Sequence, residues 1–195
     1  IREGRAVQGI PSGFIDLDQL TFGFQGGQMV IVAARPGMGK TSIALNFIEA
    51  ALFPKPGSNK SPANTLLFSL EMPARELALR LLCSRARVNM QKLRSAHPDH
   101  QTQVDLVTAA NEYRGLPLTV DDNGGQTILE IRAKCRRMHA QRKLDLIVID
   151  YIQLINGLDS SLPRGQQIAE VSRRIKAMAK EFNVPVVALA QLNRK

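Results

Sequence analysis

The chain has 195 residues, of which 44% are hydrophobic and 22% are charged, and its formal net charge is +9. These values are ordinary for a globular protein, and the length is enough for one domain with a buried core. No apolar run approaches the ~20 residues that a membrane-spanning helix needs, and no basic-then-apolar targeting segment opens the chain, so no membrane partner is expected.

The first part of the chain alternates apolar runs with helical patterns. Residues 28–33 are the first of several short apolar runs that do not alternate with polar residues, which is typical of strands covered by helices on both faces. A glycine-containing turn leads from this run into a predicted helix at residues 41–52. Residues 53–64, rich in Pro, Ser, Asn and Lys, predict a surface loop, and the second predicted strand follows at residues 65–70.

The remaining elements continue the same alternation. Predicted helices at residues 74–87 and 101–113 precede a strand at 117–120, and a helix at 127–142 opens with the capping-box pair Thr127 and Glu130. A strand at 144–149, a loop at 156–165, a helix at 166–182 and a strand at 184–190 complete the chain. Strands that alternate with helices predict an α/β fold with a mostly parallel sheet.

A candidate phosphate-binding loop follows the first predicted strand. Its glycines let the backbone wrap closely round phosphate oxygens at the positive end of a helix, Lys40 can reach the β- and γ-phosphates, and the Thr41 hydroxyl can ligate Mg²⁺. Ala34 stands where the strict pattern has glycine, and because its methyl group is small we expect the loop to bind nucleotide. The predicted cofactor-binding residues are Arg35, Pro36, Gly37, Met38, Gly39, Lys40, Thr41 and Ser42.

Three further polar residues end predicted strands. Asp150 follows four apolar residues and is suited to act on Mg²⁺ without binding the ion directly. Glu71 could orient and deprotonate an attacking water, and Gln191 could donate a hydrogen bond to the γ-phosphate. Taken singly, these residues are also consistent with an ordinary strand end, a helix-start acid and a surface amide. We expect them to gather with Lys40, because ligands bind at the carboxyl edge of open α/β sheets.

The positive charge is unevenly placed along the chain. Residues 1–131 hold 13 Lys and Arg against 12 Asp and Glu, a balance of +1, whereas residues 132–195 hold 13 against 5, a balance of +8. This asymmetry suggests an anionic partner such as nucleic acid, and it is equally consistent with a solvated or subunit-facing surface. Cys83 and Cys135 lie far apart with no metal-ligand spacing, and they predict free thiols in a reducing compartment.

Four blocks of the sequence resemble the C-terminal ATPase domain of DnaB-type replicative helicases. They begin at Gly9 with GIPSGFIDLDQLTFGFQGGQMVIVAARPGMGKTSIALN and continue with LFSLEM, LIVIDYIQLI and VPVVALAQLNRK. The resemblance implies a RecA-like P-loop fold, a ring of six subunits, and ATP hydrolysis coupled to 5'-3' translocation on single-stranded DNA. By position it assigns Lys40 and Thr41 to phosphate and Mg²⁺, Glu71 to the catalytic base, Asp150 to the Mg²⁺-side acid that acts through water, and Gln191 to γ-phosphate sensing.

The resemblance also implies partners and further domains. Family members contact primase through an N-terminal helical domain, are placed on DNA by a helicase loader, and work in a bacterial or phage-host cytoplasm in association with the nucleoid. They continue past the last block with an arginine finger and a main DNA-binding loop, so residues 1–195 are expected to be one motor domain that is incomplete at its C-terminus. An arginine finger accelerates phosphoryl transfer by roughly 10³–10⁵-fold, so this piece alone is expected to bind ATP and hydrolyse it poorly.

Two other functions that act on DNA remain open from the sequence, and a small-molecule kinase is a third option for which no lid or acceptor-substrate pocket is recognisable. A recombination or repair ATPase of the RecA/RadA kind would share the fold, and a non-motor nucleotide-switched DNA-binding regulator would share the nucleotide site. For DNA contact the sequence offers Arg164, the only basic residue of the predicted loop at 156–165. With 5% aromatic residues and no Trp, a grip on the DNA backbone is favoured over base stacking.

Overall fold

In a computed structural model the chain is described over residues 8–55, 58, 60–95, 99–157, 159 and 161–192, which include every predicted site residue and leave parts of the two predicted loops outside. Two compact units make up the chain. The larger unit draws on Ile1–Glu71 and Pro117–Lys195, and the smaller on Met72–Leu116. Each is described by itself below.

The larger unit is built on a five-stranded sheet with the order β1-β5-β4-β2-β3, in which all pairs are parallel. The strands are β1 (Met29–Ala34), β2 (Thr65–Ser69), β3 (Leu118–Asp121), β4 (Leu146–Asp150) and β5 (Val186–Gln191). Their carboxyl ends therefore meet at one edge, where Ala34 pairs with Gln191 and Ser69 pairs with Asp150. The predicted parallel α/β sheet is confirmed.

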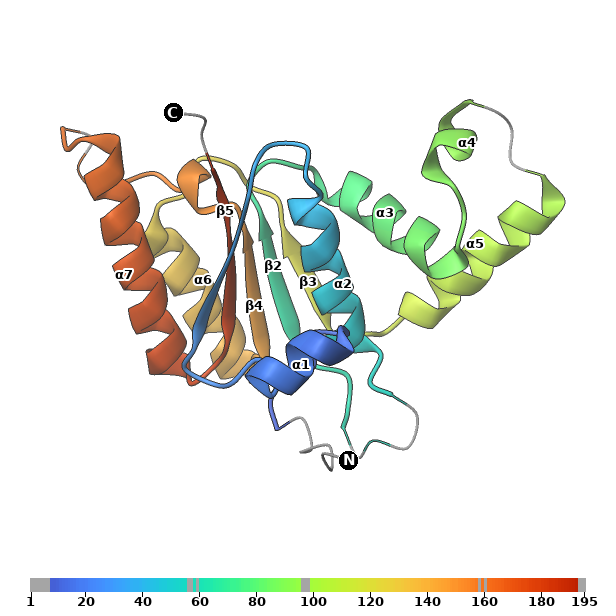
Figure 1. Cartoon of the computed structure of the whole chain (residues 1–195), viewed down its shortest axis with the longest axis horizontal. Helices are drawn as coiled ribbons and strands as arrows, with labels where there is room; N and C mark the ends of the chain where they lie inside the picture. Colours follow the sequence, from blue (N-terminus) through green and yellow to red (C-terminus); the bar gives the residue numbers. More distant parts are fainter. Residues whose placement is uncertain are drawn as a thin grey trace. The chain divides into compact units, whose positions relative to one another are not determined.

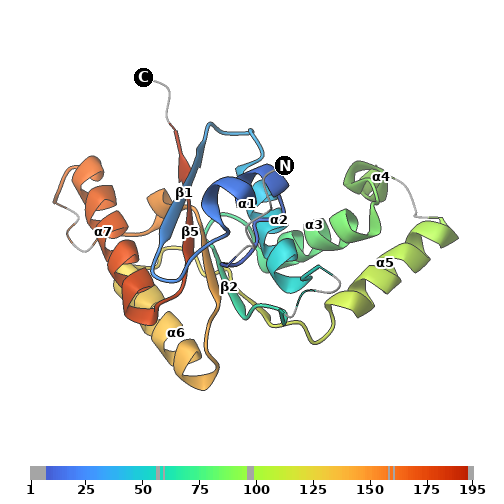
Figure 2. The ribbon, with the colours of Figure 1, turned by 60° about the horizontal axis from the view of Figure 1, so that its bottom comes forward.

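Helices lie on both faces of this sheet (Figures 1 and 2). On one face are α6 (Ile128–Gln141) and α7 (Arg164–Phe182), and on the other is α2 (Lys40–Leu52), which follows β1 directly. The apolar side of α7, with Val171, Ile175 and Met178, packs with α6 and alternate residues of the central strands in one core cluster. The helical spacing of these residues explains why this side of α7 is buried.

The edge strand β1 departs from the sequence expectation. Every residue of β2 and β4 is buried, as predicted for strands covered on both faces. Ile31 of β1, however, is 54% exposed, although it pairs with the buried Ala188 of β5. The reason is position in the sheet: among the described residues β1 is an outer strand that pairs with β5 alone, so its faces lie at the margin of the helical layers.

The starts of α6 and α7 show how far local sequence signals set the helix boundaries. Thr127 caps α6 by accepting a hydrogen bond from the backbone N–H of Glu130, whose carboxylate in turn accepts one from the Thr127 N–H, so the predicted capping box is present. The predicted helix at 166–182 begins earlier, at Arg164 after Pro163. Neither the short helix α1 (Ile15–Thr21) nor the 3-10 turn η1 (Ile152–Leu154) was predicted.

The smaller unit is helical. It contains α3 (Ala74–Ala86), α4 (Met90–Ser95) and α5 (His100–Tyr113), of which α4 was not predicted. The ion pair between Arg85 and Glu112 joins α3 to α5. Asp99 caps α5 by accepting a hydrogen bond from the N–H of Thr102.

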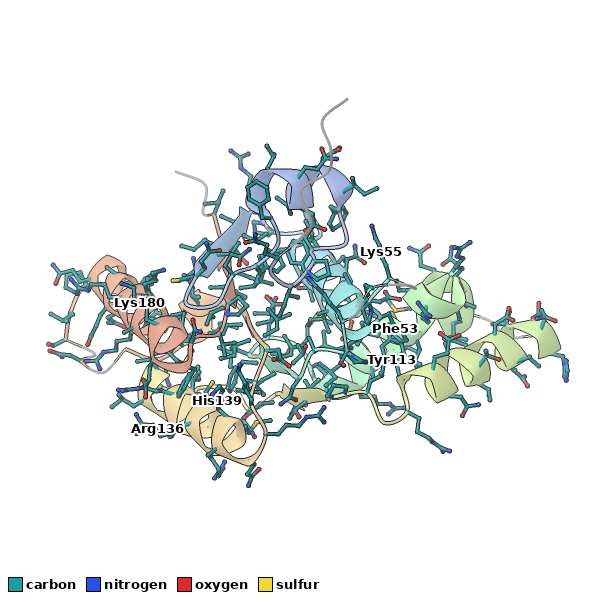
Figure 3. The ribbon with its side chains drawn as sticks, turned by 90° about the horizontal axis from the view of Figure 1, so that it is seen from below. Phe53, Lys55, Tyr113, Arg136, His139 and Lys180 are labelled. Carbon is teal, nitrogen blue, oxygen red and sulfur yellow. The ribbon has the colours of Figure 1, made fainter. Side chains whose placement is uncertain are left out.

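The outer sides of α6 and α7 carry many charged residues (Figure 3). Glu181 of α7 pairs with both Arg132 and Arg136 of α6, at 2.7 and 2.6 Å. These two hydrogen-bonded ion pairs lower the pKa of the Glu181 carboxyl.

Within the described part of the chain, no helix combines the length and apolar composition that crossing a membrane requires.

Candidate nucleotide site

The loop between β1 and α2 has the backbone conformation of a phosphate cradle. Gly37 and Gly39 have φ values of 76° and 82°, a region that side chains with a Cβ rarely adopt, so glycine is needed at both positions. Among the described residues no side chain caps the N-terminus of α2, and the N–H groups of its first turn have no partner within the helix. Ala34 ends β1 in strand conformation, which explains why alanine is tolerated there.

Asp150 joins the loop to the centre of the sheet. It ends β4 with 1% of its surface exposed, and its Oδ2 accepts a hydrogen bond from the Thr41 hydroxyl at 2.7 Å. The Lys40 ammonium lies 3.9 Å from its Oδ1. The predicted cation-binding and phosphate-binding side chains are therefore brought together from two elements that lie far apart in the sequence.

Glu71 and Tyr151 lie on the neighbouring strand ends. Glu71 follows the end of β2 and is exposed. The Lys40 ammonium lies 4.0 Å from the centroid of the Tyr151 ring, a cation–π distance. Burial raises the pKa of the Tyr151 phenol, and the negative charges of Glu71 and Asp150 raise it further.

Gln191 lies beside the phosphate loop. It is the last residue of β5 and pairs with Ala34, and the N–H of Leu192 donates to the Ala34 carbonyl at 3.0 Å. The four residues predicted to gather, Lys40, Glu71, Asp150 and Gln191, thus follow or end strands at the carboxyl edge of one sheet.

The side chains present fit a magnesium–nucleotide pair. A Thr hydroxyl and a buried carboxylate, 2.7 Å apart, are the hard oxygen donors that Mg²⁺ prefers. The glycine loop offers space for phosphate as well, because a Cβ built on Gly37 or Gly39 would meet no atom of the described residues within 4 Å beyond its own chain neighbours. The Lys40 side chain, which is 10% exposed, lies between the glycine loop and the Asp150 carboxylate.

Arg164 has several acceptors within the chain itself. It is the first residue of α7, and its guanidinium donates to the main-chain carbonyls of Gln153 and Ile155 and, at 2.8 Å, to Oε1 of Gln167. The guanidinium therefore fastens the start of α7 to η1. Its predicted contact with DNA stays a prediction.

Sequence reasoning missed two residues of this edge, Tyr151 and Gln153. Both follow Asp150 within a few positions, and a predicted strand that ends in a carboxylate was the available signal. What the sequence does not show is that η1 turns the chain back over the sheet edge, so that the Gln153 side chain reaches the backbone of Gln191.

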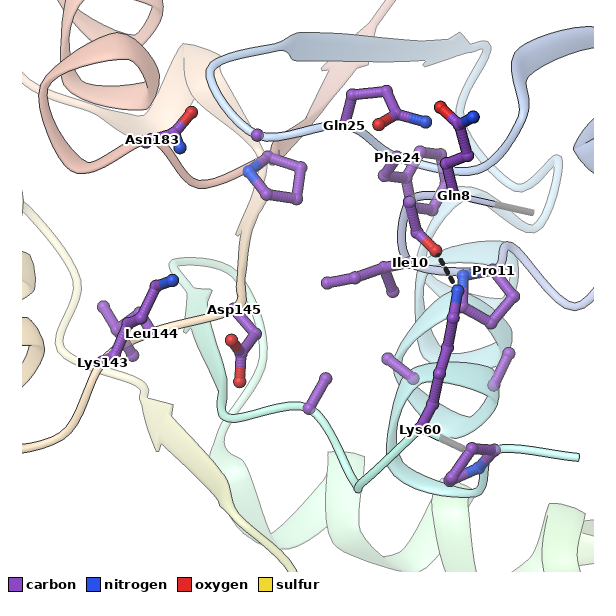
Figure 4. Close-up of a pocket in the computed structure, with 17 residues that line it drawn as sticks. Gln8, Ile10, Pro11, Phe24, Gln25, Lys60, Lys143, Leu144, Asp145 and Asn183 are labelled. Carbon is purple, nitrogen blue, oxygen red and sulfur yellow. Dashed lines mark hydrogen bonds between the residues drawn. The ribbon is translucent and has the colours of Figure 1, made fainter. Parts of the chain in front are cut away.

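A pocket of about 400 Å³ lies elsewhere in the larger unit (Figure 4). Its lining includes Ile10, Phe24 and Asp145, and the Lys60 ammonium donates to the Gly9 carbonyl at 2.6 Å beside it. None of the predicted site residues lines this pocket. It is therefore separate from the phosphate loop.

Comparison with known proteins agrees with the geometry. Replicative DNA helicases DnaB from Leifsonia xyli subsp. xyli and from Geobacillus stearothermophilus are 42% and 41% identical to this chain, over 97% and 99% of its length. The chain spans about two fifths of the length of these relatives (40% and 41%). It covers 20% of the DnaB helicase of Rhodothermus marinus, at 44% identity over 193 residues.

Two solved structures share the fold. One is described as an ATPase domain, and it superposes with a TM-score of 0.88 at 32% identity, covering 99% of this chain and 66% of that one. A DnaB-like replicative helicase, studied with its interactions with primase, gives a TM-score of 0.86 at 33% identity, covering 97% of this chain and 45% of that one. The predicted RecA-like fold is confirmed. The family model described as DnaB-like helicase C terminal domain matches residues 9–195, and the chain belongs to that family.

Proposed function

We propose that this chain is the ATP-hydrolysing motor domain of a replicative DNA helicase. The observation that carries the proposal is the meeting of Thr41, Lys40 and Asp150 at the carboxyl edge of the sheet, with the Thr41 hydroxyl 2.7 Å from the Asp150 carboxylate. Membership of the DnaB-like helicase family and the names of the relatives support the assignment to replication.

The phosphate loop holds the nucleotide in this proposal. Gly37, Gly39 and the first turn of α2 present N–H groups to the phosphates, and Lys40 adds a positive charge there. Thr41 would provide its hydroxyl to Mg²⁺, and Asp150 would act on the ion through water from the end of β4. When bound, Mg²⁺ neutralises negative charge that develops on the phosphate oxygens.

Two residues act on the γ-phosphate. Glu71, exposed at the end of β2, orients the attacking water and accepts its proton. Gln191, beside Ala34 of the loop, donates its side-chain amide to the γ-phosphate and loses that contact on hydrolysis. The remaining loop residues, Arg35, Pro36, Met38 and Ser42, shape the loop around the phosphates.

The proposed assembly rests on the family. The motor acts as a homo-hexameric ring on single-stranded DNA, moves 5'-3', and works with primase and a helicase loader in the cytoplasm, close to the nucleoid. One of the related structures is described together with its interactions with primase, which supports the primase contact. Arg164 lies at the start of α7 and is the proposed DNA contact within this chain.

ATP hydrolysis by the full-length protein, with and without single-stranded DNA, tests this function. The variants are Lys40→Ala and Glu71→Ala, with Lys143→Ala as the matched control because Lys143 is exposed and lies outside the site. We expect DNA to stimulate hydrolysis severalfold in the wild type and in the control. Both site variants should lose at least about 10²-fold in kcat, the scale of removing one preorganised catalytic group.

The outcomes separate the candidate functions. DNA-stimulated hydrolysis together with unwinding of a forked duplex supports the helicase. Stimulation without unwinding, but with strand exchange, favours a recombination or repair ATPase. Hydrolysis indifferent to DNA would contradict the motor and leave a nucleotide-switched regulator.

A further inference from the structure

The strand that carries Gln191 extends beyond its neighbour. The recorded pairs between β4 and β5 end at Ile149 and Ala188, whereas β5 continues to Gln191. On the other side, Gln191 is in register with Ala34 of β1. In the described part of the chain, the end of β5 is therefore paired with a strand on the β1 side only.

The side chain of Gln153 takes the place of the missing strand on the other side. Its Nε2 donates to the main-chain carbonyl of Gln191 at 3.1 Å, and its Oε1 accepts from the Gln191 N–H at 3.1 Å. One donor and one acceptor of a side-chain amide thus satisfy both backbone groups of a single residue. Only one orientation of the amide makes both bonds, so the pair is a specific contact.

Gln153 is itself fastened to α7. Its main-chain carbonyl accepts a hydrogen bond from the Arg164 guanidinium, which also donates to Ile155 at 3.4 Å and to Gln167 at 2.8 Å. Gln167 donates in turn to the carbonyl of Leu162, just before the helix. A continuous set of hydrogen bonds therefore runs from the backbone of Gln191, through η1, to the first turn of α7.

We propose that Gln153 is a positioning residue that fixes the backbone of Gln191 at the nucleotide site, and that Arg164 connects it to the start of α7. This rests on the proposed function, in which the Gln191 amide contacts the γ-phosphate. Fixing the backbone fixes the direction in which that amide leaves the strand. A displacement of about 1 Å in a catalytic arrangement can cost about 10²-fold in rate. The two hydrogen bonds from Gln153 to the Gln191 backbone therefore matter more for hydrolysis than for nucleotide binding, which the phosphate loop provides.

The experiment compares Gln153→Ala and Gln153→Glu with wild type in the full-length protein. Glu keeps the size of Gln and still accepts from the Gln191 N–H, but it sets a carboxylate oxygen against the Gln191 carbonyl. Gln141→Ala is the matched control, since Gln141 is an exposed glutamine at the end of α6. Rates are expressed per nucleotide-binding site, titrated with fluorescent ADP, so that an unfolded fraction does not count.

We expect both Gln153 variants to lose about tenfold or more in DNA-free kcat while KM for ATP changes less than about threefold, because the lost positioning acts on the transition state. The control should match the wild type. If wild-type protein hydrolyses ATP and Gln153→Glu keeps its kcat, the positioning role is wrong and the proposed function stands. A rise in KM at unchanged kcat would also overturn the role. Wild-type protein that does not hydrolyse ATP would contradict both.

Arg164→Lys tests the connection to α7. Lysine keeps the charge that DNA would meet, but its ammonium cannot serve carbonyls and an amide through a planar fork. If Arg164 acts through Gln153, DNA-free kcat falls about threefold or more, and the double variant with Gln153→Ala loses no more than Gln153→Ala alone, because the two effects are not additive within one network. If Arg164 only contacts DNA, DNA-free kcat is unchanged, and the connection is overturned.

Discussion

Cys135 shows how strongly the interior of this fold controls a single side chain. It lies on the inner side of α6 with no exposed surface, and burial raises the pKa of its thiol to about 12. Because the thiolate is the reactive form, native protein at pH 8 should leave Cys135 unmodified by iodoacetamide. Mass spectrometry after labelling, with urea-unfolded protein as the fully labelled reference, measures this. Labelling of native Cys135 as fast as in urea would contradict the burial.

The same thiol gives a direction to the pH dependence of stability. Its folded pKa of about 12 lies above the ordinary value of 9.0, so its contribution is fully present below pH 9 and is lost as the pH rises towards 12. The loss of free energy of unfolding between pH 8 and pH 10.5 should therefore be smaller in Cys135→Ala than in wild type, measured by urea titration at both values. An equal loss in the two proteins would show that Cys135 does not contribute.

At the level of residues, local motifs were predictable and remote contacts were not. Lys40 and Thr41 follow from glycine spacing within a few positions, and Asp150 follows from a strand that ends in a carboxylate. The bonds of Gln153 to Gln191 depend on how η1 turns over the sheet edge, and no sequence spacing encodes that turn. The internal partners of Arg164 likewise depend on the folded path of the chain.

Among the elements, α6 has the best-defined start. The Thr127 side chain accepts from the Glu130 N–H, and such N-caps contribute about 1 kcal/mol. Thr127→Ala should lower the free energy of unfolding by about that amount, whereas Thr127→Ser, which keeps the hydroxyl, should lower it by much less. Urea titration of the three proteins at pH 7 measures the difference. Equal losses in the two variants would show that the methyl group matters and the cap does not.

The Glu130 half of the capping box depends on pH. Hydrogen bonds from the backbone N–H and hydroxyl of Thr127 lower the pKa of its carboxyl below the ordinary 4.5. Its contribution is therefore present above pH 4.5 and is lost as the pH falls through the lowered value. The difference in stability between wild type and Glu130→Gln should shrink on acidification over this interval.

Elements were predictable where periodicity or capping was strong. The long helices and all five strands lie within a few residues of their predicted positions, because apolar spacing reports the face that is buried. The short α1 and α4 escaped prediction, since six or seven residues are too few to show a helical period. The exposed side of β1 escaped it because strand order in the sheet is set by tertiary packing and not by the strand's own residues.

For the whole molecule, the second part of the chain keeps an excess of basic residues even when its ion pairs are counted. Arg132 and Arg136 share Glu181, Arg174 pairs with Glu170, and Lys134 pairs with Asp121. Residues 132–195 nevertheless contain only 5 acidic residues against 13 basic ones, a formal balance of +8, and of the pairs named here only the one with Asp121 draws its acid from outside this range. A field of this sign attracts an anionic partner over a Debye length of about 10 Å at 0.1 M salt.

This excess predicts how single-stranded DNA binds. Each phosphate neutralised contributes a slope of about −0.7 to log affinity against log salt, so neutralising about three phosphates weakens binding about twentyfold between 50 and 200 mM salt. With 5% aromatic residues and no Trp, base stacking should add little, and oligo(dT) and a mixed sequence of equal length should bind within about threefold of each other. Fluorescence anisotropy of the full-length protein with both oligonucleotides, at constant ATP-analogue concentration, measures slope and preference together. A flat salt dependence would remove the phosphate backbone as the main contact, and a large preference for one sequence would place base recognition in its stead.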